Sequence, residues 1–146
     1  MVLGAELVTR IDQAVSLYGP GRPIPEQELR ERLSGIGLEP DPEYAAFVGR
    51  WGGCYVGVPV HAWDHASTLG RETCVDLTLR ARANFGEVID GLVFAEDGSG
   101  NPLWIGADRA VHLSDHDGGP QIRQIASSFS ALLSENVHDE SSTTFG

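Results

Sequence analysis

Residues 92–133 read LVFAEDGSGNPLWIGADRAVHLSDHDGGPQIRQIASSFSALL. Three short apolar runs within this stretch, Leu92–Ala95, Leu103–Ile105 and Val111–Leu113, are separated by segments rich in Gly, Asp and Asn. These residue types favour tight turns, and consecutive strands joined by short turns must pair antiparallel. The stretch therefore predicts an antiparallel meander, to which Gln121–Ile125 adds either a last strand or only a turn.

A helix is expected to follow the meander. Ser127 or Ser128 can cap its start, because a serine hydroxyl accepts a hydrogen bond from the first free backbone N–H groups of a helix. Phe129, Leu132 and Leu133 then recur at helical spacing and form its inner face.

Apolar spacing and capping residues also organise the N-terminal half of the chain. Asp41 followed by Pro42 is typical of a helix start. The alternating, β-branched segment Cys54–Val60 predicts one strand, and residues 61–70 predict a loop. The predicted helices cover residues 4–18, Glu26–Leu33, Asp41–Trp51 and Glu72–Asn84, the last with Val75 and Leu79 facing inward.

Helices first, a sheet in the middle and a helix last is an α+β order. We expect a mostly antiparallel mixed sheet flanked by N-terminal helices and a C-terminal helix. A chain of 146 residues is long enough for one hydrophobic core. We therefore predict a single domain over residues 1–135, followed by a flexible polar tail over residues 136–146.

The charge balance restricts the classes of partner. The net charge is −11, and all ten basic residues are Arg. A surface of this sign does not favour nucleic-acid phosphates or anionic membranes, and the lack of Lys excludes Schiff-base and P-loop chemistry. Seven carboxylates lie between Glu87 and Gln121, against the single Arg109. The start of the chain has no secretory pattern and no apolar run reaches membrane-spanning length, so a cytoplasmic location is expected.

Several polar clusters contain residue types that can form chemical sites. His61 and His65 are four residues apart, as in some metal sites, but their segment is not a convincing helix. The segment Asp97–Asn101 resembles half of a calcium loop, yet a hairpin turn built on its Gly residues explains it more simply.

A second acidic and imidazole cluster contains His112, His116, Asp115 and Asp117. Alternation along the strand places His112 opposite to Val111 and Leu113, so a solvent-facing polar edge is expected there, with a partner-binding or metal role as the alternative. No Gly-x-Ser-x-Gly elbow surrounds a serine, and Cys54 and Cys74 are expected to be buried thiols. We predict no catalytic residue, no metal site and no cofactor.

Three blocks of the sequence form a pattern when they are taken in order. The first block is Pro40–Gly53, an aromatic helix that ends in Gly-Gly. The second is the strand–turn–strand segment Val93–Gly106. The third combines the strand Ala110–Leu113, the sequence Asp-His-Asp-Gly-Gly and the helix start Ile125–Phe129 with Leu132-Leu133. In this order the blocks resemble the SUKH superfamily, named for yeast cell-wall-synthesis regulators and their bacterial relatives, over roughly residues 25–135.

The resemblance implies a mixed sheet wrapped by helices and no enzymatic activity. It also implies an immunity protein that neutralises a cognate bacterial toxin, of nuclease or deaminase type, by direct binding. Carboxylates on a preformed surface suit such a basic partner, because complementary charge speeds encounter. The residues expected to contact the toxin are Asp64, Glu96, Asp97, Asp115 and Asp117, with Trp63 as an aromatic anchor.

Two other functions remain open at this point. The chain could be a regulatory scaffold that binds an endogenous protein, as the resemblance to eukaryotic relatives implies. It could instead be a metal-dependent hydrolase that uses His61, His65 and nearby carboxylates. The neighbouring gene separates the immunity and scaffold functions, and metal analysis tests the hydrolase.

Overall fold

A computed structural model describes residues 3–63, 69–115 and 121–137. Its helices and strands confirm the predicted α+β class. In chain order the elements are α1 (Ala5–Tyr18), α2 (Glu26–Ser34), α3 (Pro42–Trp51), β1 (Cys54–Tyr55), β2 (Pro59–Val60), α4 (Cys74–Phe85), the 3-10 turn η2 (Gly86–Val88), β3 (Leu92–Glu96), β4 (Pro102–Ile105), β5 (Val111–Asp115), β6 (Gln121–Ala126) and α5 (Phe129–Asn136).

The meander forms a four-stranded sheet in the order β3-β4-β5-β6. Gln121–Ala126 is a strand, not only a turn. Every strand pair among the described residues is antiparallel, so the parallel pairing that a mixed sheet needs is not found in this part of the chain. The polar segments between the apolar runs are the turns, as their residue types predict.

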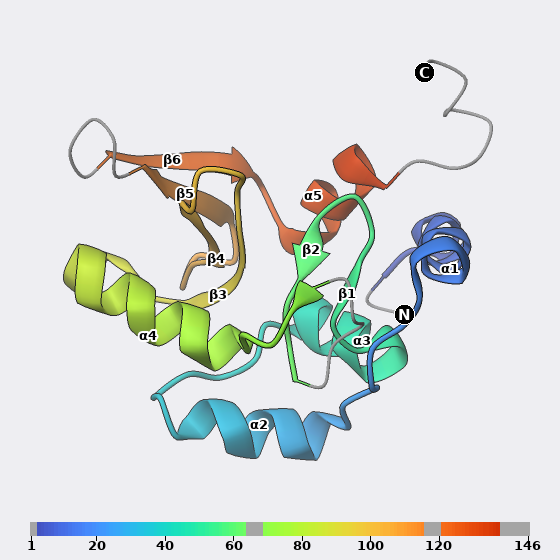
Figure 1. Ribbon diagram of the computed structural model, residues 1–146, viewed down its shortest axis with the longest axis horizontal. Helices are drawn as coiled ribbons and strands as arrows, with labels where there is room; N and C mark the ends of the chain where they lie inside the picture. The colour runs from blue at the N-terminus through green and yellow to red at the C-terminus, as the bar shows by residue number, and fades with distance from the viewer. Residues whose placement is uncertain (1–2, 64–68, 116–120, 138–146) are drawn as a thin grey trace.

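Both faces of the sheet are covered (Figure 1). On one face Phe129 of α5 lies between three other buried aromatic rings, with ring centroids 5.1 Å from Phe94, 5.7 Å from Tyr44 and 5.8 Å from Phe47. Edge-on aromatic contacts of this kind add to the stabilisation from apolar burial. On the other face α4 covers β3 and β4 and encloses a smaller apolar cluster that includes Trp104.

The prediction of one strand over Cys54–Val60 is wrong, because the chain turns back within it. β1 and β2 form a short antiparallel hairpin. Gly57 has φ +89° and sits against the backbone of α5, where an added Cβ would lie 2.1 Å from the carbonyl oxygen of Asn136. Only Gly combines this conformation with such a close approach. Packing against α5 therefore requires Gly at the position where the predicted strand breaks.

The inner face of α4 also differs from the prediction. Leu79 is 48% exposed, whereas Leu77, Thr78 and Ala81 are buried against the sheet. Burial of Thr78 is possible because its hydroxyl donates to the Cys74 carbonyl and accepts from the Val93 N–H. Thr78 thus occupies part of the buried face of α4 that apolar periodicity alone assigns to Leu79.

The packed part of the chain continues slightly beyond the predicted boundary at residue 135. Val137 is buried, and the Arg10 guanidinium donates to its carbonyl at 3.2 Å. Residues 138–146 of the predicted tail lie outside the described residues. Among the described residues no helix has the length and apolarity needed to cross a membrane.

Candidate interaction surfaces

The strand register places Glu96, Asp97 and Asp115 at the same end of the sheet. Glu96 pairs with Pro102 at the start of β4, and Asp115 ends β5 next to that point. The structure therefore brings together three of the carboxylates that were predicted to contact a partner. Asp64 and Asp117, the other two predicted acidic contacts, lie outside the described residues, as do His65 and His116.

Asp97 is used to build its own turn. Its carboxylate accepts hydrogen bonds from the N–H groups of Ser99 at 2.8 Å and Asn101 at 2.9 Å, and from the Asn101 side-chain amide at 3.1 Å. Gly100 supplies a positive φ of 83°, whereas Gly98 does not. The hairpin turn is confirmed, and it occupies the oxygens that a partner would need.

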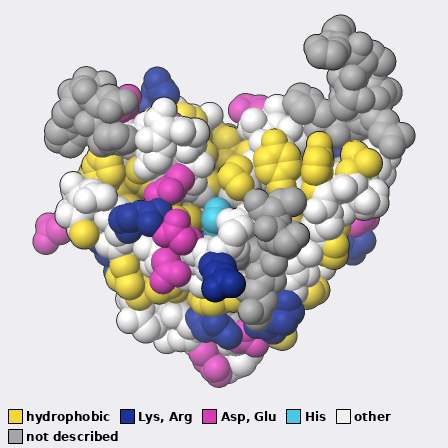
Figure 2. All heavy atoms as spheres, in the orientation of Figure 1, with side chains coloured by type: hydrophobic (Ala, Val, Ile, Leu, Met, Phe, Trp, Pro, Cys, Tyr) yellow, Lys and Arg dark blue, Asp and Glu magenta, His cyan; other side chains and the backbone are white. Residues whose placement is uncertain are grey.

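Glu96 is also engaged within the molecule. Its carboxylate lies 2.7 Å from the Arg80 guanidinium, which also binds Glu72. The hydrogen bonds from Arg80 to Glu72, and then to Glu96, raise the pKa of Arg80. Figure 2 shows acidic and basic side chains next to one another over α4 and β3. The third carboxylate at this end, Asp115, is half-buried.

Trp63 is a core residue and not an exposed anchor. Its exposed fraction is 9%, and the Arg32 guanidinium carbon lies 4.8 Å from the centre of its ring. A cation over the indole face stabilises both groups and covers the ring. Little of the Trp63 side chain is therefore accessible to a partner.

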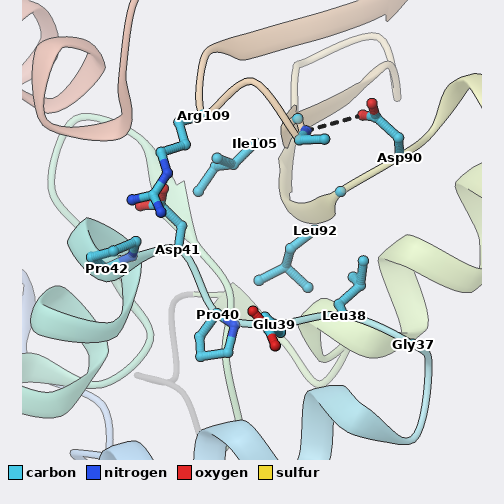
Figure 3. Close-up of a pocket in the computed structure, with 13 residues that line it drawn as sticks. Gly37, Leu38, Glu39, Pro40, Asp41, Pro42, Asp90, Leu92, Ile105 and Arg109 are labelled. Carbon is cyan, nitrogen blue, oxygen red and sulfur yellow. Dashed lines mark hydrogen bonds between the residues drawn. The ribbon is translucent and has the colours of Figure 1, made fainter.

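At the opposite end of the sheet a cleft of about 300 Å³ separates the α2–α3 connection from the β4–β5 turn. Its charged lining consists of Glu39, Asp41 and Asp90 with Arg109, and Leu92 forms part of its apolar floor. Figure 3 shows Asp90 on one side of the cleft and Asp41 with Arg109 on the other. We call this the acidic cleft.

Local chemistry fixes the two main carboxylates of the acidic cleft. Asp41 caps α3, and its Oδ2 accepts hydrogen bonds from the N–H groups of Glu43 at 3.0 Å and Tyr44 at 3.1 Å. Asp90 precedes β3 and accepts a long hydrogen bond of 3.4 Å from the Ala107 N–H of the β4–β5 turn. Both carboxylates are therefore attached to regular elements, while each keeps a second oxygen that could serve a ligand.

Burial raises the pKa of Asp41, whereas its two backbone hydrogen bonds and the charge of Arg109 lower it. The pKa increase means that the negative charge is poorly solvated in the folded protein. A cation placed in the acidic cleft would relieve that cost. This part of the sheet is therefore suited to bind a positively charged group.

The β4–β5 turn forms the upper wall of the acidic cleft and is held by His112. The prediction that His112 faces solvent is wrong, because its side chain is only 14% exposed and its ring lies 4.7 Å from that of Trp104. Alternation along β5 places it correctly opposite to Val111, but its ring is covered by Trp104, its pairing partner on the neighbouring strand β4. His112 Nε2 lies 3.0 Å from Asp108, and this contact is the main cause of the lowered pKa of Asp108.

The described residues contain no group of three His, Cys, Asp or Glu side chains placed to hold a metal. His61 directs its Nδ1 to the Glu72 carbonyl at 2.8 Å. Cys54 and Cys74 are buried, as predicted, and burial raises the pKa of each thiol to about 12. Both thiols are therefore protonated at neutral pH and poor nucleophiles.

Sequence reasoning did not identify the acidic cleft. Asp41 was recognised only as a helix cap, and Glu39, Asp90 and Arg109 received no role. One signal was available: the carboxylate-rich segment around the β4–β5 turn contains a single Arg. The α2–α3 connection, however, precedes that turn by more than sixty residues, and no local pattern pairs them.

Comparison of the chain with protein-family models, with curated proteins and with solved structures gives no match. The resemblance to the SUKH superfamily therefore rests on the three sequence blocks alone.

Proposed function

We propose that this protein is a non-enzymatic binding protein of the immunity type, and that it neutralises a basic toxin by accepting a cationic side chain of the toxin in the acidic cleft. The observation that carries the proposal is the lining of the cleft. Three carboxylates, Glu39, Asp41 and Asp90, face a space of about 300 Å³ beside one guanidinium, that of Arg109. The cleft is thus concave and has an excess of negative charge.

An arginine or lysine side chain of the toxin is the group that fits this site best. A guanidinium can bridge carboxylates with paired hydrogen bonds, and Leu92 and Ile105 offer apolar surface for its aliphatic stem. The cost of burying Asp41 is already met by folding, so a bound cation gains more from that carboxylate than from a fully hydrated one.

The net charge of −11 supports the same role at longer range. It attracts a basic protein before contact and raises the association rate, an effect that salt weakens. Blocking the substrate-binding surface of a nuclease or deaminase requires only that the bound protein stays in place. The resemblance to bacterial immunity proteins supports this mechanism independently of the acidic cleft.

The test is co-expression with the product of the adjacent gene. We expect this protein to co-purify with that product and to protect cells from it. The triple variant E39Q/D41N/D90N keeps side-chain shape and the helix cap but removes the cleft charge, and we expect it to bind at least tenfold more weakly.

A matched control removes three charges elsewhere. Glu6, Glu26 and Glu135 are exposed and lie outside the cleft lining, so E6Q/E26Q/E135Q changes the net charge equally. We expect this control to lose less than about twofold in affinity. Equal losses in the two triple variants would show that total charge, and not the acidic cleft, determines binding. Failure to bind or protect would contradict the immunity role.

A further inference from the structure

Arg109 has an unusual backbone conformation. Its φ is +68°, the only positive φ among the described residues that are not glycine. This left-handed conformation costs about 1–2 kcal/mol for a residue with a side chain. Two hydrogen bonds that close the β4–β5 turn hold Arg109 in this conformation. The Arg109 N–H donates to the Gly106 carbonyl, and the Gly106 N–H donates to the Ala110 carbonyl, both at 2.9 Å. Gly or Asn would occupy the same position with less strain.

The strained backbone places the Arg109 side chain at the acidic cleft. Figure 3 shows it extending to Asp41 and Pro42 along one wall. Its charge lowers the pKa of Asp41, so the two groups attract each other. Within residues 3–63, 69–115 and 121–137, however, Arg109 has no carboxylate partner within the 4.0 Å of an ion pair, and its side chain is exposed. The attraction therefore acts without a fixed contact.

We propose that Arg109 is a built-in counter-ion of the acidic cleft, and that it competes with the partner's cation for the same carboxylates. This inference rests on the proposed function. In the free protein Arg109 reduces repulsion among Glu39, Asp41 and Asp90. An exposed guanidinium without a fixed contact is weakly held, so an incoming cation can displace it. Arg109 thus lowers the affinity for single cations and favours a partner that makes further contacts around the cleft.

The experiment measures binding of a hexa-arginine peptide by calorimetry at about 20 mM salt, where charge screening is weak. Arg109→Gln removes the charge and keeps a side chain at the strained position. Arg109→Gly removes both the charge and the strain. Arg123→Gln is the matched control, because Arg123 is exposed on β6, outside the cleft lining, and its loss changes the net charge equally.

We expect both Arg109 variants to bind the peptide roughly threefold to tenfold more tightly than the wild type, the effect of one nearby charge at intermediate dielectric. Arg123→Gln should give less than about a twofold change, because long-range charge alone acts there. Unchanged or weaker binding by Arg109→Gln would overturn the counter-ion role. Tighter binding by Arg109→Gly alone would also overturn it, since backbone strain and not charge would then be responsible.

The same measurements separate this inference from the proposed function. Combining Arg109→Gln with E39Q/D41N/D90N should abolish the gain in affinity. If the gain persists without the three carboxylates, the peptide binds elsewhere and both proposals fail. If the wild type binds and depends on those carboxylates while Arg109→Gln brings no gain, the acidic cleft stands and only the counter-ion role fails. If neither the wild type nor either Arg109 variant binds, both proposals are rejected.

Discussion

At one end of the four-stranded sheet, the β3–β4 turn folds around its own carboxylate; at the other end, the β4–β5 turn is held partly by side chains from outside it. Asp97 accepts three hydrogen bonds within its turn. The β4–β5 turn instead depends on Asp90 and His112, and it presents a strained Arg109 to the acidic cleft.

The difference shows that acidic residues are not equally available for binding. At the β3–β4 end Glu96 pairs with Arg80 and Asp97 closes a turn, so these negative charges serve the fold. At the β4–β5 end Glu39, Asp41 and Asp90 share one cleft with a single guanidinium. A carboxylate whose hydrogen bonds are already made contributes little binding free energy towards a partner's cation. A poorly solvated carboxylate contributes more.

The largest expected effect is on stability at the β3–β4 end. Asp97→Ala should lower the free energy of unfolding by roughly 2–3 kcal/mol, because it removes three hydrogen bonds and leaves the buried Asn101 amide without this acceptor. Asp90→Ala removes one long hydrogen bond and should lower it by less than about 1 kcal/mol. Urea denaturation measures both values. Equal losses would show that the carboxylates at the two ends of the sheet contribute equally to stability.

A pair of glycine substitutions sharpens the comparison. An added Cβ at Gly106 would lie 2.8 Å from Asp108 Oδ1 and 3.0 Å from His112 Cδ2, so Gly106→Ala should destabilise by about 1–2 kcal/mol. At Gly98 nothing lies within 4 Å and φ is not positive, so Gly98→Ala should be neutral or slightly stabilising. Thermal unfolding tests this; a neutral Gly106→Ala would show that the β4–β5 turn is not tightly held.

Relieving backbone strain at one end of the sheet and introducing it at the other should change the free energy of unfolding in opposite directions. Arg109→Gly relieves a positive φ and should raise the free energy of unfolding by up to about 1 kcal/mol. Gly100→Ala introduces a side chain at φ +83° and should lower it by about 1 kcal/mol. Denaturant midpoints of the two variants should therefore move in opposite directions. A loss of stability in Arg109→Gly would mean that the Arg109 side chain contributes more than the strain costs.

The smallest expected effect is on the pH dependence of stability. The His112 contact lowers the pKa of Asp108, so its contribution is present above the ordinary Asp value of about 3.9 and is lost as pH falls through the folded value. Because Asp108 is mostly exposed, screening limits this to no more than about 0.5 kcal/mol. The wild type should thus have a higher free energy of unfolding than Asp108→Asn at pH 6, and this difference should vanish near pH 2. A difference that is constant with pH would indicate that the contact is not electrostatic.

Local chemistry was enough to predict much of the fold. The turns of the meander follow from Gly, Asp and Asn, and the start of α3 follows from Asp41 and Pro42, whose capping hydrogen bonds the structure shows. Ser128, one of the two serines predicted as the cap, caps α5. Each of these features depends on residues that are close together in the sequence.

The missed features depend on distant contacts. The Gly at the strand break, Gly57, packs against the backbone of Asn136, and the burial of His112 depends on Trp104 of the neighbouring strand β4. The acidic cleft combines Asp41 with Asp90 and Arg109, which come from three separate connections. Alternation and helical periodicity describe one element at a time, so neither could bring these residues together.

The most direct test of the account is an NMR titration of the isotope-labelled protein with the hexa-arginine peptide. We expect saturable amide shifts in residues 37–42, 90–92 and 105–110, which surround the acidic cleft. Residues 96–101 and Asp115, at the opposite end of the sheet, should remain unshifted. Shifts confined to that opposite end would contradict the claim that the available negative charge lies in the cleft.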